Sequence, residues 1–160
     1  MSERSDASRV TAASTGWTWG PLSSLGWSVA ALVFVVDQLN KWWMLQVLGL
    51  KEGARMRILP VLDLVYVKNL GISYGLFTQH GNLGQWLLAV FALICCLLLG
   101  IWIARTAANR LIVVSLGLII GGALGNALDR LLAGGVHDFY SLHAFGMYWY
   151  VFNIADAAIV

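Results

Sequence analysis

Residues 111–128 read LIVVSLGLIIGGALGNAL, a run of 18 residues without a charge, opened by Arg110 and closed by Asp129. A second run, residues 86–104, reads WLLAVFALICCLLLGIWIA and holds 19 residues without a charge. A helix needs about 20 predominantly apolar residues to cross the core of a bilayer. The two runs therefore predict two membrane-spanning helices.

The composition agrees with a membrane protein. The 160 residues are 59% hydrophobic and only 11% charged, and the mean hydropathy is +0.76. Soluble domains average about 45–50% apolar and about 25% charged residues. This content of charged residues is too low for the surface of a water-soluble protein. The chain is therefore predicted to be an integral membrane protein of one domain. Its net charge of +2 is too small to indicate a nucleic-acid partner.

Two further spans are predicted from weaker runs. Residues 22–36 are apolar and reach membrane length only when residues 37–43 are included. A last run begins near Met147 and stops at Val160, where its helix would rise only about 21 Å against a core of about 30 Å. We expect an all-α bundle of four transmembrane helices, the fourth truncated at 160. Residues 1–20 are expected to be a disordered lead-in, and residues 21–160 a single transmembrane domain.

The stretch between the first two spans, residues 51–81, differs in character. Alternation over residues 61–68 predicts one or two short strands. Because open strand edges are not tolerated in lipid, we expect a small β-sheet at the membrane surface between helices 1 and 2. Flanking tryptophans suit an interfacial aromatic belt: Trp42, Trp43 and Trp86. The basic residues are divided equally between the two sides, so they do not predict the orientation.

Polar residues gather near the ends of the predicted spans, although a charge at the centre of a span costs about 2.5–3.5 kcal/mol. Asp37 and Lys41 are spaced i, i+4 and can pair on one helix face, either as an ordinary ion pair at the interface or as part of a site. Gly117, Gly121 and Gly125 predict a face for close helix packing. The other polar residues of these clusters are Asn69, Asn126, Asp129, Arg130, Asp138, Asn153 and Asp156.

Asp138 and Asp156 are the most suggestive pair, because two carboxylates that meet at a membrane edge suit general acid–base catalysis. From the residues alone, an ion or proton pathway and a structural pairing with Arg130 or Lys41 remain open. A zinc site with His137 and His143 is a further alternative, although no helical pair of histidine ligands is present. The adjacent Cys95 and Cys96 are interpreted as packing residues.

Taken in order, these clusters carry a set of family motifs. They are D-Q-x-x-K at residues 37–41, N-x-G at 69–71, G-G-A-x-G-N-x-x-D-R at 121–130, V-x-D-F at 136–139 and F-N-x-A-D at 152–156. In these motifs and their order the chain resembles lipoprotein signal peptidase (signal peptidase II), a family of bacterial membrane aspartyl proteases. Two departures are visible. GISYG at residues 71–75 replaces the family's G-A-A-F/W, and the sequence ends at Val160 without the rest of the expected last span or a basic tail.

The resemblance implies roles for the polar residues. Asp138 and Asp156 would be the catalytic pair, with no metal and no cofactor. Asp37 and Lys41 would stabilise the site between the first span and the sheet. Substrate binding and support would fall to Asn69, Gly71, Asn126, Asp129, Arg130 and Asn153.

The resemblance also implies a substrate and a location. The substrate would be a prolipoprotein whose cysteine carries diacylglycerol, cut just before that cysteine. The enzyme would be a monomer in the bacterial inner membrane, with cytoplasmic termini, an extracytoplasmic sheet and an active site at the outer leaflet beside membrane lipid. Cyclic peptide antibiotics such as globomycin would inhibit it. A small transporter or proton-conducting subunit is the alternative, which the lack of polar residues at the midplane of residues 86–104 disfavours.

Overall fold

The computed structural model describes residues 19–71, 82–106 and 109–160. The predicted lead-in falls almost wholly outside these residues, and so do Ile72, Ser73 and Tyr74 of the departing motif.

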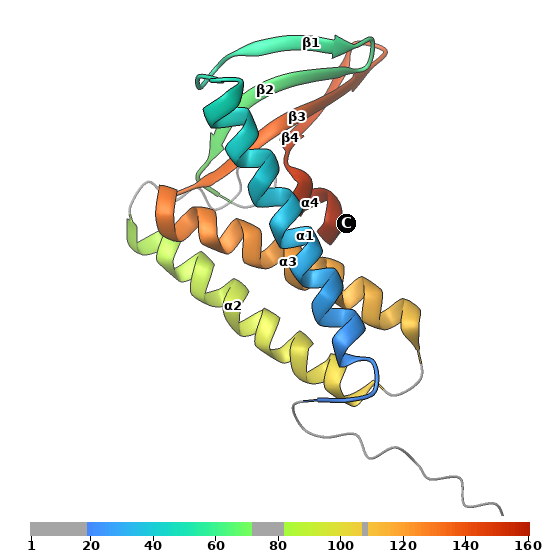
Figure 1. The fold of residues 1–160 in the computed structure, drawn as a ribbon. Coiled ribbons are helices and arrows are strands. Elements are labelled where there is room, and N and C mark those ends of the chain that lie inside the picture. The colour runs from blue at the N-terminus through green and yellow to red at the C-terminus, as the bar shows by residue number, and fades with distance from the viewer. Residues whose placement is uncertain (1–18, 72–81, 107–108) are drawn as a thin grey trace, which may run out of the picture.

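Three long helices form a bundle: α1 (Ser23–Trp42), α2 (Asn82–Arg105) and α3 (Arg110–Ala133) (Figure 1). Within the described part of the chain, α2 and α3 are long and apolar enough to cross a membrane, with mean hydropathies of 2.9 and 2.1. A short π-helical turn, η1 (Trp43–Val47), continues α1. Asn109 caps the start of α3 by accepting the Ile112 N–H, and Gly134 ends it in the left-handed conformation.

The glycine face predicted in α3 is confirmed as its contact with α1. A Cβ atom on Gly117 would lie 2.6 Å from the Gly26 carbonyl oxygen, and one on Gly121 would lie 2.5 Å from the Ala30 carbonyl oxygen. The absence of side chains at these two positions lets the backbones approach closely. This approach brings the polar ends of α1 and α3 together.

A four-stranded antiparallel sheet lies over one end of the bundle, in the order β1 (Arg55–Leu59), β2 (Leu62–Asn69), β3 (Val136–Ala144) and β4 (Met147–Phe152) (Figure 1). The strands predicted between the first two helices are present as β1 and β2. The expectation that the sheet comes only from that connection is wrong, because β3 and β4 come from the connection between α3 and α4. In the register of β2 and β3, Asn69 pairs with Val136 and Val67 with Asp138.

The segment predicted as a fourth membrane-spanning helix does not form one continuous helix. Residues 147–152 are the strand β4, and only Ile154–Ile159 form a helix, α4. The sequence MYWYVF is aromatic and β-branched, a composition that favours strands, and its backbone pairs with β3. α4 then packs against α3 and α1.

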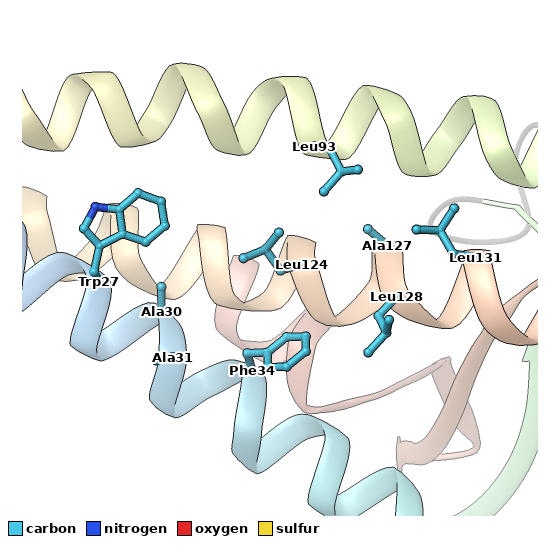
Figure 2. Close-up of a pocket in the computed structure, with 9 residues that line it drawn as sticks. All are labelled: Trp27, Ala30, Ala31, Phe34, Leu93, Leu124, Ala127, Leu128 and Leu131. Atoms are coloured by element: carbon cyan, nitrogen blue, oxygen red, sulfur yellow. The ribbon is translucent and has the colours of Figure 1, made fainter. Parts of the chain in front are cut away.

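An apolar groove of about 370 Å³ lies among α1, α2 and α3 (Figure 2). Trp27 and Phe34 of α1 and Leu93 of α2 flank it, and α3 contributes a row of apolar side chains: Leu124, Ala127, Leu128 and Leu131. None of its lining residues carries a charge, as expected for a surface facing hydrocarbon.

Candidate active site

Four elements bring the predicted polar residues together between the bundle and the sheet. Asn126 lies on α3, Asn69 ends β2, Asp138 lies on β3 and Asp156 lies in the first turn of α4. Residues far apart in sequence meet because β3 returns from the end of α3 to pair with β2 (Figure 1).

Asp138 is almost fully buried and has a donor on each carboxylate oxygen. The Asn153 side chain donates to its Oδ1 at 2.7 Å, and the Asn69 side chain donates to its Oδ2 at 3.0 Å. Burial, together with the negative charge of Asp156, raises the pKa of Asp138 to about 7. The carboxyl therefore exchanges a proton near neutral pH.

Asp156 is half-buried and fixed by the start of α4. Its Oδ2 accepts the Asn153 backbone N–H at 3.2 Å, while the Asn153 Oδ1 accepts the Asp156 N–H at 2.9 Å. This reciprocal pair is a capping box. The expectation that Asn153 lies inside a span is wrong, since it precedes the helix as its N-cap. The cap holds the carboxylate of Asp156 in place.

Two asparagine side chains connect the two aspartates. The Asn126 Nδ2 donates to the Asp156 Oδ1 at 2.8 Å. The Asn153 Nδ2 donates to Asp138 and also to the Asn126 Oδ1, at 3.1 Å. Asp138, Asn153, Asn126 and Asp156 thus form one continuous hydrogen-bonded network, in which every amide N–H named here points to an acceptor.

A buried ionic cluster lies next to this network. The Lys41 Nζ is 2.7 Å from the Asp37 Oδ2 and 2.8 Å from the Asp129 Oδ2, and it also donates to the Asn126 Oδ1 at 3.4 Å. The i, i+4 pairing predicted for Asp37 and Lys41 is confirmed. The Asp37 Oδ1 accepts the Ala155 N–H at 3.0 Å, so the cluster also ties α1 to α4.

Asp129 belongs to this cluster rather than to the aspartate network. Besides pairing with Lys41, its Oδ2 accepts the His137 backbone N–H at 3.1 Å, just before Asp138 on β3. Asp129 therefore links α3 to the strand that carries Asp138.

Arg130 binds the backbone just after β2. Its guanidinium donates to the Gly71 carbonyl oxygen at 2.9 Å and to the Asn126 carbonyl oxygen at 3.2 Å. The Asn69 side-chain oxygen accepts the Gly71 N–H at 2.9 Å. Asn69 thus has two contacts, one to the turn after β2 and one to Asp138.

A cavity of about 190 Å³ opens onto these residues. Asn69, Asn126, Arg130 and Asp156 give it a polar side. The other lining residues are mainly apolar: Ala92, Ala123, Val136, Tyr150, Val151 and Ile159. Such a cavity suits a substrate that is polar at its reacting bond and apolar beside it.

Sequence reasoning left some members of the site without a role. The Gln38 Nε2 lies 3.1 Å from the Asp37 Oδ2 and 3.2 Å from the Asp129 Oδ1, so it bridges both partners of Lys41. The position of Gln38 inside the D-Q-x-x-K motif was the signal in the sequence for this role. Tyr140, which accepts a hydrogen bond from Asn40 at 2.7 Å, had no such signal within an aromatic stretch.

The histidines lie in other surroundings. The His137 Nδ1 is 2.9 Å from the Tyr66 hydroxyl, and the His143 Nε2 is 3.1 Å from the Asp63 Oδ1. Among the described residues, no group of three or more His, Cys, Asp or Glu side chains is placed to hold a metal ion. The zinc set considered from the sequence is therefore not assembled there.

Comparison with known proteins identifies the family. Residues 29–160 match the family model described as signal peptidase (SPase) II. The lipoprotein signal peptidase of Beijerinckia indica subsp. indica is 49% identical, over 85% of this chain and 81% of that protein. The lipoprotein signal peptidase of Methylobacterium sp. (strain 4-46) is 51% identical, over 85% and 82%.

Solved structures agree with the sequence comparison. A bacterial membrane enzyme determined by the in meso method at 2.3 Å resolution has a TM-score of 0.69 and 27% identity, covering 85% of this chain and 80% of its own. A second such structure, at 1.9 Å resolution, has a TM-score of 0.68 and 26% identity, covering 85% of each chain. On its motifs, its fold and these matches, the chain belongs to the signal peptidase II family.

Proposed function

We propose that the chain is an aspartic endopeptidase that removes the signal peptide from diacylglyceryl-modified prolipoproteins, cutting just before the lipidated cysteine. Family membership supports the reaction, since the relatives named above are lipoprotein signal peptidases. The observation that carries the assignment of the site is the network that joins Asp138 and Asp156 through Asn153 and Asn126.

The two aspartates divide the acid and base roles. Asp138, with its pKa raised to about 7, holds the proton and donates it to the scissile carbonyl oxygen. Asp156, which lines the cavity, takes a proton from the water that attacks the carbonyl carbon. The tetrahedral intermediate collapses when the C–N bond breaks and the leaving amine receives a proton from the Asp156 carboxyl. Asp138 recovers its proton from the intermediate's hydroxyl, so both carboxyl groups return to their starting states.

The asparagines and Lys41 orient this pair. The Asn126 oxygen faces the Lys41 ammonium and the Asn153 amide, so its Nδ2 is directed to Asp156. A reversed carboxamide would place its N–H groups against the ammonium. Lys41 thereby acts as a positioning residue, and Asp37 and Asp129 hold it in place.

The remaining polar residues hold the substrate backbone. Arg130 and Asn69 line the cavity, and Arg130 also donates to the Gly71 carbonyl oxygen. In this role they present the scissile peptide to the aspartates, while the apolar wall accommodates the side chain and lipid of the modified cysteine.

The proposal places the site at the outer leaflet of the bacterial inner membrane. Residues 21–160 act as one peptidase domain, with α1, α2 and α3 across the bilayer, α4 as the fourth helix, both termini cytoplasmic and the sheet outside. Two features favour this placement: the apolar lengths of α2 and α3, and the gathering of polar residues at one end of the bundle. The enzyme works as a monomer beside membrane lipid, and its cavity binds cyclic peptides such as globomycin.

The experiment is cleavage of two matched prolipoproteins by the purified chain in detergent micelles, one carrying diacylglycerol on the cysteine and one unmodified. We expect a gel shift from loss of the signal peptide only with the modified substrate. Equal cleavage of both would contradict the substrate assignment, and cleavage of neither would contradict the activity.

A further inference from the structure

Two turns lie next to each other at one end of the sheet. The turn between β1 and β2 contains Pro60 and Val61, and the turn between β3 and β4 contains Phe145 and Gly146. The His143 N–H, near the end of β3, donates to the Val61 carbonyl oxygen at 2.9 Å and so joins the first turn to the strand that leads into the second. Both project to one side of the bundle, away from α2 (Figure 1).

This end of the sheet exposes large apolar side chains. Phe145 is 101% exposed, Met147 is 72% exposed and Trp149 is 60% exposed. Met147 and Trp149 line an open hollow of about 590 Å³, and Phe145 lies in the turn between two of its lining residues, Ala144 and Met147. The lining is almost entirely apolar or aromatic: Val61, Leu142, His143, Ala144, Met147, Tyr148 and Trp149. We call Phe145 and these seven residues the hairpin patch. A contiguous apolar surface of this kind indicates an interaction site.

Phe145 occupies a turn position whose backbone conformation is unfavourable for phenylalanine. Phe145 has φ 52° and Gly146 has φ 80°, so both central residues of this two-residue turn are left-handed. Such a turn favours Asn, Asp or Gly at the first position. The ring is fully exposed, so packing within the chain does not offset this unfavourable conformation.

Positive charge borders the hairpin patch. The buried Asp63 pairs with Arg55 at 2.8 Å and with Arg57 at 3.7 Å, which leaves one carboxylate for two guanidinium groups. The side chains of Arg55 and Arg57 are 49% and 69% exposed. Arg55 also lies 5.2 Å from the centre of the Tyr148 ring, next to the hollow. An aromatic apolar tip beside exposed arginines matches the boundary between acyl chains and anionic headgroups.

We propose that the hairpin patch is an interfacial anchor: it inserts into the headgroup region of the leaflet next to the active site, and Arg55 and Arg57 contact the phosphates of anionic phospholipids. The inference rests on the proposed placement of the bundle in a bilayer, and not on the chemistry of the aspartates. Charge complementarity favours anionic lipid. The proposed placement also puts the exposed apolar side chains of α1 and α2 in the same bilayer.

The anchor has a direct link to the site. β3 carries the hairpin turn at its C-terminal end and Asp138 near its start. A hairpin held at fixed depth in the leaflet therefore fixes the height of Asp138 above the acyl chains, where the lipidated cysteine must be presented.

The test measures the depth of a fluorophore on the full chain in vesicles of phosphatidylglycerol and phosphatidylcholine. Cys95 and Cys96 are replaced by Ala, and an environment-sensitive nitrobenzoxadiazole probe is attached to Met147→Cys. Glu52→Cys, an exposed position outside the patch, and Phe91→Cys, exposed on α2, serve as controls. Nitroxide-labelled lipids act as quenchers, labelled either near the headgroup or deep in the acyl chain.

We expect the probe at 147 to emit at shorter wavelength and to be quenched by the shallow nitroxide at least about twofold more than the probe at 52. Phe145→Asn keeps the favoured Asn–Gly turn but removes the ring, so it should reduce quenching at 147 about twofold. The pair Arg55→Gln and Arg57→Gln should abolish any difference between vesicles with and without phosphatidylglycerol.

Three results would overturn the anchor while the peptidase proposal stands. They are water-like emission at 147, quenching that appears only after a prolipoprotein is added, and quenching that depends on the protein-to-lipid ratio. The second would assign the patch to substrate, and the third to another copy of the chain. An unquenched probe at Phe91 would overturn the membrane placement, and the anchor with it.

Discussion

At the scale of single residues, the two aspartates differ in what surrounds them. Asp138 is buried between Asn69 and Asn153, and burial with the charge of Asp156 raises its pKa to about 7. Asp156 faces the cavity and accepts hydrogen bonds from Asn126 and from the N-cap of α4. In the proposed mechanism these surroundings, rather than the residue type, give Asp138 the acid role and Asp156 the base role.

The raised pKa of Asp138 predicts a pH dependence of stability. The folded chain binds this proton more tightly than the unfolded chain, whose carboxyl titrates near 3.8. The stabilisation is therefore complete below about pH 4 and is lost as the pH rises to about 7. Asp138→Asn should remove this loss, and thermal unfolding in micelles from pH 4 to pH 8 measures it. Equal pH dependence of the two chains would contradict the assigned pKa.

The Lys41 cluster predicts a large cost for removing one charge. Lys41→Met keeps the length of the side chain but leaves Asp37 and Asp129 buried without their cation. Removal of one partner from a buried ion pair costs about 3–5 kcal/mol of unfolding free energy. Denaturant unfolding in micelles should detect it, with Lys51→Met as a control on an exposed lysine. Similar stability of the two variants would show that the cluster is solvated.

At this scale the sequence was informative because carboxylates and amides are costly in apolar segments. Their positions marked these residues as candidates, and the family resemblance assigned them to one site. Asp37, Lys41, Asn126, Asp138, Asn153 and Asp156 do lie together. Spacing could not predict the contacts themselves. The Asn126 carboxamide is oriented by Lys41 on α1 and by Asn153 before α4. Both contacts form only once the chain has folded.

At the scale of elements, the long helices followed from uncharged runs, but the second half of the sheet did not. Residues 147–160 were predicted as one helical span because the whole run is apolar. The aromatic strand β4 occupies its first part, where pairing with β3 satisfies the backbone. The break falls at Asn153, whose capping role separates strand from helix. Apolar content alone cannot distinguish these two structures over so short a run.

The N-cap of α4 predicts that stability and activity can be separated. Asn153→Ala loses the cap and should cost about 0.5–2 kcal/mol of unfolding free energy. Asn153→Ser retains a capping oxygen but lacks the amide N–H groups that reach Asp138 and Asn126. Thermal unfolding should therefore recover in the Ser variant, while prolipoprotein cleavage should not. Recovery of both would limit Asn153 to capping.

At the scale of the whole molecule, the bundle and the sheet place one polar site between an apolar interior and the surrounding water. The α1–α3 glycine contact brings the helix ends together, and the sheet closes over them (Figure 1). The orientation of this arrangement did not follow from the sequence, because the basic residues are balanced between the two sides.

The proposed orientation can be measured by labelling. Glu52 lies on the sheet side and Thr106 at the opposite end of α2. In a chain with Cys95 and Cys96 replaced by Ala, Glu52→Cys should react with an impermeant thiol reagent in intact spheroplasts. Thr106→Cys should react only after lysis. The reverse pattern would place the site on the cytoplasmic side, where the proposal does not hold.

The central claim is that Asp138 and Asp156 together carry out the cleavage. The most direct measurement is the turnover of a diacylated prolipoprotein by the wild-type chain and by Asp138→Asn and Asp156→Asn, with and without a chelator. Each variant keeps the shape of its side chain but cannot titrate, so each should lose at least about 100-fold in rate, while the chelator leaves the wild-type rate unchanged. Near-normal turnover by either variant, or activity lost with chelator and restored by zinc, would contradict the claim.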